Sequence, residues 1–155
     1  MNKIIRTVQH SITRSVSSTR AVLQNPKYFT QDHEWLQLKA DGIFKVGITK
    51  HAADNLGEIT YLGLEELQEM IDDEEVVDFG GSLCEIESVK SAATIGAPIS
   101  GVPLKINEML SDEDGKLMNA DPENAGFLCE MKVADFDDNE LMSELAYKKY
   151  LEASK

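Results

Sequence analysis

The chain has 155 residues, of which 42% are hydrophobic, so its length suits one domain with a single core plus a tail. Its 28 acidic residues outnumber the 15 basic ones and give a formal net charge of −13. Because phosphate backbones attract clusters of Lys and Arg, we expect no nucleic-acid partner. No stretch approaches the roughly 20 consecutive apolar residues that cross a bilayer, so we expect no membrane partner either.

Residues 1–27 differ in charge from the rest of the chain, because they hold five bases and no acid, whereas every acid lies from Asp32 onward. Apolar residues recur every four positions and form one helical stripe, Ile4, Val8, Ile12 and Val16. This pattern is typical of a mitochondrial transit peptide, so we expect cleavage between Arg20 and Tyr28 and a location in the mitochondrial matrix. The alternative is a basic tail that stays attached.

The remainder of the chain is strongly acidic. Without the five bases of residues 1–27, ten bases stand against 28 acids, a net charge of about −18. Such a surface is suited to docking on basic patches of partner proteins, although solubility alone explains it equally well.

The first predicted elements are two paired strands. Polar and apolar residues alternate over 34–39 and 43–48, and Ala40-Asp41-Gly42 between them has turn chemistry, which predicts a hairpin. Thr49 can then cap a short helix closed by Gly57. The next elements in the chain are this helix and a further strand, over residues 49–56 and 59–64.

An acidic stretch, residues 65–75, predicts a solvated connection with at most one helical turn. Gly80-Gly81 marks the entry to a strand over 83–89. The following region is too broken for a helix because it holds Pro98, Gly101 and Pro103. A short strand with Leu104 and Ile106 on one face comes next.

The last part of the chain predicts a loop over 119–126 and an alternating strand over 127–133. Asp137 or Asp138 is placed to cap a helix that runs to about Glu152. Many short strands with one terminal helix indicate a mainly β fold. We expect a small barrel or sandwich with short helices and a C-terminal helix.

The two cysteines, Cys84 and Cys129, are too few for a disulfide-built secreted scaffold. Each alternates with apolar residues of a predicted strand, so we interpret both as core side chains rather than redox or metal residues. Trp35 is interpreted as a core anchor.

Lys90 lies between two strand-like runs, which places its amine at the exposed tip of a hairpin, where a modifying enzyme can reach it. A surface lysine taken alone usually has no function. His33 and Glu34 could form an acid and base pair, but no nucleophile or metal-ligand spacing accompanies them. The sequence therefore favours a structural or pocket role for these two residues.

Several segments match, in the right order, the H protein of the glycine cleavage system. The resemblance covers residues 28–153, and it is the ordered set that is specific. The matching segments are residues 28–35 (YFTQDHEW), 46–49 (VGIT), 56–59 (LGEI), 87–90 (ESVK), 97–101 (APISG) and 106–108 (INE).

The resemblance implies that residues 28–155 form a lipoyl-carrier domain with the barrel-sandwich hybrid fold of lipoyl domains. In that family the lysine of the ESVK segment carries lipoic acid in amide linkage. Lys90 would therefore be an N6-lipoyllysine, with Glu87, Ser88 and Val89 as the context that the attaching enzyme recognises. The covalent tether keeps a reactive unit close to each docked active site.

The resemblance also implies the partners, none of which is part of this chain. A glycine decarboxylase loads an aminomethyl group on the lipoyl arm, and an aminomethyltransferase passes the one-carbon unit on. Dihydrolipoyl dehydrogenase then restores the disulfide. The H protein is a carrier in this cycle and not an enzyme, and a lipoyl-attaching enzyme is a fourth partner.

The family shelters the loaded arm in a cleft near the DHEW segment, so the resemblance implies that Glu34 helps to hold the aminomethyl group. Three positions depart from the family pattern. Thr94 stands where many members have Asp, which weakens any account of how the amine is held. The other two, Phe127 and Val102-Pro103, are interpreted as packing changes.

Four alternatives remain open. A biotin carrier is disfavoured because methionines flank the lysine in that family, whereas Val89 and Ser91 flank it here. The lipoyl domains of 2-oxoacid dehydrogenases usually have Asp before the lysine and belong to longer chains. A lipoyl relay that supplies lipoate to other 2-oxoacid dehydrogenases, and an unmodified binding module of the same fold, cannot be separated from a glycine cleavage carrier by residue pattern.

Overall fold

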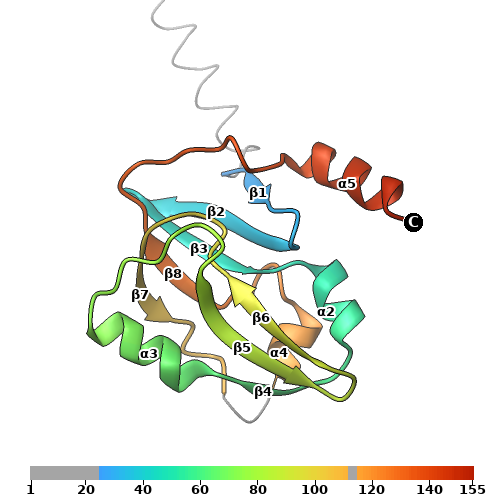
Figure 1. Cartoon of the computed structure of the whole chain (residues 1–155), viewed down its shortest axis with the longest axis horizontal. Coiled ribbons are helices and arrows are strands. Elements are labelled where there is room, and N and C mark those ends of the chain that lie inside the picture. The colour runs from blue at the N-terminus through green and yellow to red at the C-terminus, as the bar shows by residue number, and fades with distance from the viewer. Residues whose placement is uncertain (1–24, 112–114) are drawn as a thin grey trace, which may run out of the picture.

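The computed structural model describes residues 25–111 and 115–155, and it forms two antiparallel sheets with helices around them (Figure 1). The predicted transit peptide lies outside the described residues, apart from its last three positions. The larger sheet has the strand order β1-β2-β3-β8-β7. Its strands are β1 Lys27–Phe29, β2 Glu34–Ala40, β3 Ile43–Ile48, β8 Cys129–Lys132 and β7 Val102–Ile106.

The smaller sheet has the order β4-β5-β6, so that β5 is paired on both sides. Its strands are β4 Ile59–Leu62, β5 Ser82–Ser88 and β6 Ala92–Gly96. One contiguous core contains buried residues of both sheets, including Val46 and Met131 of the larger sheet and Ile86 of the smaller one. The two sheets therefore pack face to face, and they do not join into a closed barrel. The mainly β fold is as expected, with the barrel open.

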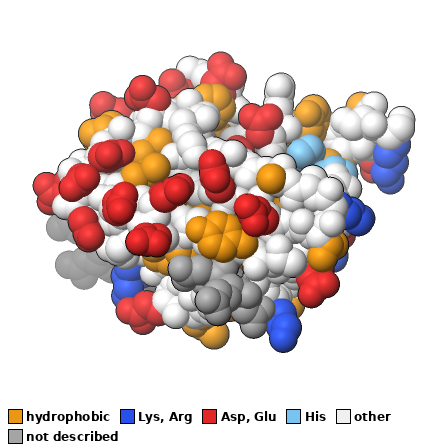
Figure 2. Space-filling view, turned by 60° about the horizontal axis from the view of Figure 1, so that its bottom comes forward, with side chains coloured by type: hydrophobic (Ala, Val, Ile, Leu, Met, Phe, Trp, Pro, Cys, Tyr) orange, Lys and Arg blue, Asp and Glu red, His pale blue; other side chains and the backbone are white. Residues whose placement is uncertain are grey.

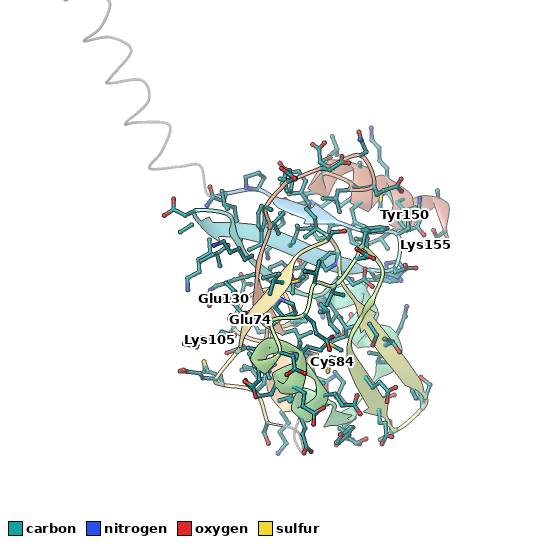
Figure 3. The ribbon with its side chains drawn as sticks, turned by 60° about the vertical axis from the view of Figure 1, so that its left-hand side comes forward. Glu74, Cys84, Lys105, Glu130, Tyr150 and Lys155 are labelled. Carbon is teal, nitrogen blue, oxygen red and sulfur yellow. The ribbon has the colours of Figure 1, made fainter. Side chains whose placement is uncertain are left out.

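Both cysteines lie in this core. Cys84 and Cys129 are buried, and Figure 3 marks Cys84 inside the molecule. Burial raises the pKa of the Cys84 thiol to about 12 and also raises the pKa of Cys129. Both side chains therefore stay neutral at physiological pH, which confirms their interpretation as core residues.

The predicted hairpin of β2 and β3 is confirmed, with Asp41 and Gly42 at positive φ in its turn. The helix after it is also confirmed. Helix α2 spans Lys50–Leu56, the Thr49 side chain accepts a hydrogen bond from the Ala52 amide, and Gly57 closes the last turn.

The acidic stretch 65–75 is not a loose connection, because most of it forms α3, Leu64–Asp72. Leu64 and Leu67 are buried, and Met70 and Ile71 pack partly against the core. Apolar residues at this spacing give the helix one buried face while the acids occupy the other. The prediction of a solvated connection was wrong because it considered the acidic residues and not the helical spacing of the apolar ones.

A second helix was missed at the start of the predicted loop 119–126. Helix α4 spans Lys116–Ala120, and Gly115 precedes it. A Cβ added at Gly115 would lie 2.3 Å from Ile59 Cγ2, so only glycine lets α4 approach β4 this closely. Strands β4, β5 and β8 differ from their predicted bounds by at most two residues at either end.

The C-terminal helix exists, but the predicted cap is wrong. Helix α5 spans Glu144–Ala153, and the Ser143 side chain accepts a hydrogen bond from the Ala146 amide. The residues before it are extended because Met142 forms a β-bridge with Phe29. Asp137 instead accepts a hydrogen bond from the Asn139 amide in a local turn.

Helix α5 is docked by aromatic side chains. Tyr147 is buried and stacks on Phe29 with ring centroids 4.6 Å apart, in a small cluster that also contains Trp35. The Trp35 indole donates to the Pro122 carbonyl at 3.1 Å, so its role as a core anchor is confirmed. Leu145, in the first turn of the helix, is 65% exposed.

Candidate functional site

Lys90 occupies the turn between β5 and β6, as the sequence predicts, and its side chain is exposed. The hairpin closes with a hydrogen bond of 2.8 Å from the Ser88 amide to the Ser91 carbonyl, and Glu87 pairs with Ala92 one step below. The amine is therefore carried at the end of two paired strands rather than on a free loop.

The Ser88 side chain stabilises this turn from inside. Its hydroxyl donates to the Ser91 carbonyl at 3.0 Å and accepts from the amides of Lys90 and Ser91 at 3.3 and 3.2 Å. A serine hydroxyl that bonds three neighbouring backbone groups gives the turn one preferred conformation. Ser88 is thus placed to fix the backbone at Lys90.

The other two residues of the predicted recognition context face solvent. Glu87 is exposed, and Val89 is 62% exposed. The Val89 amide donates to the Glu58 carbonyl at 3.0 Å, so the backbone of the turn is tied to the segment before β4. An approaching enzyme can contact the side chains of Glu87, Val89 and Lys90 without opening the hairpin.

Glu34 lies at the start of β2 and is buried, with 6% of its surface exposed. Its carboxylate accepts from the Thr30 hydroxyl at 2.5 Å and from the Gly96 amide at 3.4 Å. Burial raises the pKa of Glu34, and these two hydrogen bonds partly oppose that shift.

Glu34 and Lys90 lie near opposite ends of β6, Ala92–Gly96, although neither residue belongs to that strand. Gly96, which donates to Glu34, ends β6, whereas Lys90 precedes its first residue, Ala92. Four residue steps at about 3.3 Å each separate Ala92 from Gly96 by about 13 Å. Thr94 is exposed on this strand and pairs with Glu85.

Beside Glu34 the structure brings together side chains that the sequence did not connect. His33 Nδ1 lies 2.8 Å from the Tyr147 hydroxyl, which also lies 2.8 Å from the Thr49 hydroxyl. The ring of His51, from the first turn of α2, lies 4.5 Å from the His33 ring. Pairings over so many residues leave no local signal in the sequence. His10 is outside the described residues.

His33 itself is held in an unusual backbone conformation, with φ of 68°, in the tight turn that joins β1 to β2. Burial lowers its pKa, the nearby His51 lowers it further, and Asp32 acts in the opposite direction. The cluster of His33, His51, Thr49 and Tyr147 thus connects α5 to the beginning of α2.

Two further features concern residues 25–111 and 115–155. None of the helices there has the length and apolar character needed to cross a membrane. Nor does this part of the chain bring three or more His, Cys, Asp or Glu side chains into a group that could hold a metal ion.

Comparison with known proteins agrees with this fold. The family model "Glycine cleavage H-protein" matches residues 27–154. The crystal structure of a glycine cleavage system H protein from Mycobacterium marinum superposes with a TM-score of 0.69 and 27% sequence identity. The alignment covers 84% of this chain and 99% of that one.

Sequence relatives carry the same name. A probable glycine cleavage system H protein of Thermococcus gammatolerans is 41% identical over 129 residues, which cover 81% of this chain and 90% of that protein. Fold and relatives together define a carrier protein rather than an enzyme. The chain belongs to the glycine cleavage H-protein family.

The matches do not support the expectation that this chain is specifically a mitochondrial member of the family. The relatives include archaeal proteins, such as that of Thermococcus gammatolerans, and one from the bacterium Thermotoga maritima, which is 39% identical over 125 residues. A putative mitochondrial H protein of Schizosaccharomyces pombe is 33% identical over 139 residues and covers 89% of this chain. These matches establish the family and not the branch.

The histidine cluster predicts a pH dependence of stability. The ordinary pKa of His33 is 6.5 and its pKa in the folded protein is lower, so the unfolded chain binds the proton more readily. The contribution of neutral His33 to the free energy of unfolding is therefore present above pH 6.5 and is lost as the pH falls through the pKa of His33 in the folded protein.

Thermal unfolding of the wild type and His33→Asn at several pH values between about 7.5 and 5.5 measures this effect, because Asn tolerates positive φ and does not titrate. The wild type should lose more stability over this range than the variant. Equal losses would show that His33 does not link protonation to folding.

Proposed function

We propose that this protein carries lipoic acid on Lys90, in amide linkage, and serves as the lipoyl carrier of a glycine cleavage system. The observation that supports this most directly is the hairpin turn, which presents an exposed amine from a backbone fixed by Ser88 and by the Val89 amide. Membership of the H-protein family supports the identity of the group.

The surroundings of Lys90 suit an amide-linked group. Its side chain is exposed and passes over Gly57, which has no Cβ to obstruct it. For attachment, the neutral Lys90 nitrogen attacks the carbonyl carbon of an activated lipoyl group such as lipoyl adenylate, which is a mixed anhydride. The amide bond forms as the activating group leaves with its electron pair, and the nitrogen loses a proton.

When bound, lipoic acid supplies a disulfide that can open to accept a one-carbon unit and close again by oxidation. The chain contributes position rather than chemistry. Lys90 tethers the group, Ser88 fixes the turn, and the exposed side chains of Glu87 and Val89 provide contact points for the attaching enzyme.

Glu34 is proposed to interact with the cationic end of the loaded arm. A carboxylate in a buried setting attracts an amine more strongly than one in water. Because Glu34 lies at the far end of β6, the arm must extend along this strand to reach it. Thr94, on the exposed face, brings no charge to assist.

The proposed partners are glycine decarboxylase, aminomethyltransferase, dihydrolipoyl dehydrogenase and a lipoyl-attaching enzyme. Figure 2 shows acidic side chains gathered over one half of the face it displays, with few Lys or Arg among them. Exposed acids of α3, such as Glu65, Glu66 and Glu69, belong to the described surface. Charge of one sign favours encounter with basic patches around partner active sites.

Replacing Lys90 by Arg tests the carrier role. The guanidinium keeps the charge but cannot serve as the acylated amine, so lipoylation and glycine-dependent reduction of the carrier should both be lost. The change lies at an exposed turn, so the free energy of unfolding should change by no more than about 0.5 kcal/mol.

The measurement compares wild type and Lys90→Arg after co-expression with a lipoate ligase, by mass, melting curve and a glycine decarboxylase assay. A folded variant that still becomes lipoylated would place the arm on another lysine. A lipoylated wild type that glycine and the decarboxylase do not reduce would favour the lipoyl relay.

We also propose that residues 1–27 direct the protein to the mitochondrial matrix. The five bases, the absence of acids and the four-residue apolar spacing support this, as does the similarity to a putative mitochondrial H protein of fission yeast. A reporter fused to residues 1–27 should be imported into mitochondria. The same leader with its bases changed to Gln is the control, and a cytosolic wild-type fusion would refute the localisation.

A further inference from the structure

Asn119 of α4 makes a two-way contact with the backbone beside the Lys90 hairpin. Its amide nitrogen donates to the Gly57 carbonyl at 2.7 Å, and its amide oxygen accepts from the Ile59 amide at 2.9 Å. A side-chain amide that both donates and accepts pairs with the chain as a neighbouring strand would. The segment 57–59 is therefore held from the side of α4.

The same short segment holds the hairpin turn on its other side. The Glu58 carbonyl accepts from the Val89 amide at 3.0 Å, and Ile59 is paired with Ser88. Figure 1 shows α2 and α4 beside the end of the smaller sheet where β5 turns into β6. Asn119 thus reaches the Lys90 turn through one intervening segment.

Gly57 adds a direct contact with the lysine. Its φ is +76°, and a Cβ built on it would lie 3.3 Å from Lys90 Cε and 3.7 Å from Nζ. The aliphatic stem of Lys90 therefore crosses the glycine at close range. The Gly57 amide, which donates to the Ala53 carbonyl at 3.1 Å, fixes this glycine to the end of α2.

We propose that Asn119 and Gly57 are positioning residues for the attachment site, so that the attaching enzyme recognises a lysine held on this support and not the ESVK segment alone. The proposal rests on the proposed role of Lys90 as the lipoylated residue. Asn119 acts by fixing segment 57–59, which fixes the turn, and Gly57 acts by setting the path of the lysine stem.

A general stabilising role for Asn119 is the competing explanation, and the chain contains a matched residue that separates the two. Asn107 also bridges backbone groups, donating to the carbonyls of Ala125 and Phe127 and accepting from the Met109 amide. It supports the segment before β8, with no hydrogen bond to segment 57–59 or to the Lys90 turn among those of the described residues.

The test uses full-length Asn119→Asp, with Asn107→Asp as its control. Asp can still accept from the Ile59 amide, but it loses the donor to the Gly57 carbonyl and places an acid there. Lipoate ligase kinetics are measured well below each melting temperature, so that every variant is folded. Native-state hydrogen exchange of the Val89 amide is measured on the same samples.

Asn119→Asp should lower kcat/KM for lipoylation about tenfold, mainly through KM, which corresponds to the loss of one hydrogen bond of about 1.4 kcal/mol. It should also speed exchange of the Val89 amide. Asn107→Asp should lower the melting temperature while leaving both readouts near wild type. Equal kinetics for wild type and Asn119→Asp, or equal losses in both variants, would overturn the proposal.

Gly57→Ala is a second test variant that leaves Asn119 intact, and it tests the proposal if Asn119→Asp does not fold. The added methyl should displace the Lys90 stem and lower kcat/KM for lipoylation by a similar factor. Unchanged kinetics would contradict the proposal that Gly57 sets the path of the Lys90 side chain. Failure of the proposed function looks different, because the wild type itself would then resist lipoylation.

Discussion

Backbone pairing on both sides of β5 is the constraint on which the placement of Lys90 depends. Ser88, the last residue of this central strand, is paired with Ile59 of β4, and Glu87 is paired with Ala92 of β6. The inward side chains of the strand, such as Ile86, are buried in the core shared by both sheets. The lysine side chain can therefore be exposed while the turn that holds it directly follows a strand that is paired on both sides.

The reactive side chains of the interior differ from Lys90 in their exposure to solvent. The buried thiols of Cys84 and Cys129 stay protonated because burial raises the pKa of each, so neither would compete in thiol exchange with the disulfide of the proposed lipoyl group. The carboxylate of Glu34 is likewise enclosed and hydrogen-bonded. The chain thus keeps both thiols and the Glu34 carboxylate inside, and it holds the Lys90 amine outside at a hairpin turn.

Elements whose signals are local could be predicted from the sequence, and those fixed by distant partners could not. The β2 and β3 hairpin, the Thr49 cap and the Lys90 turn depend on neighbouring residues, and the structure has all three. The start of α5 depends on the bridge between Met142 and Phe29, far apart in the chain, so the capping residue was predicted wrongly. The supports of the site were missed for the same reason, because Asn119 meets Gly57 only after α4 has packed on β4.

The central claim is that Lys90 carries an amide-linked lipoyl group in the protein as it occurs in its source. Mass measurement of the isolated protein, intact and after digestion, tests this most directly. The peptide containing Lys90 should gain the mass of one lipoyl group, and peptides with other lysines should gain none. A Lys90 peptide of unmodified mass, from cells with active lipoate metabolism, would contradict it.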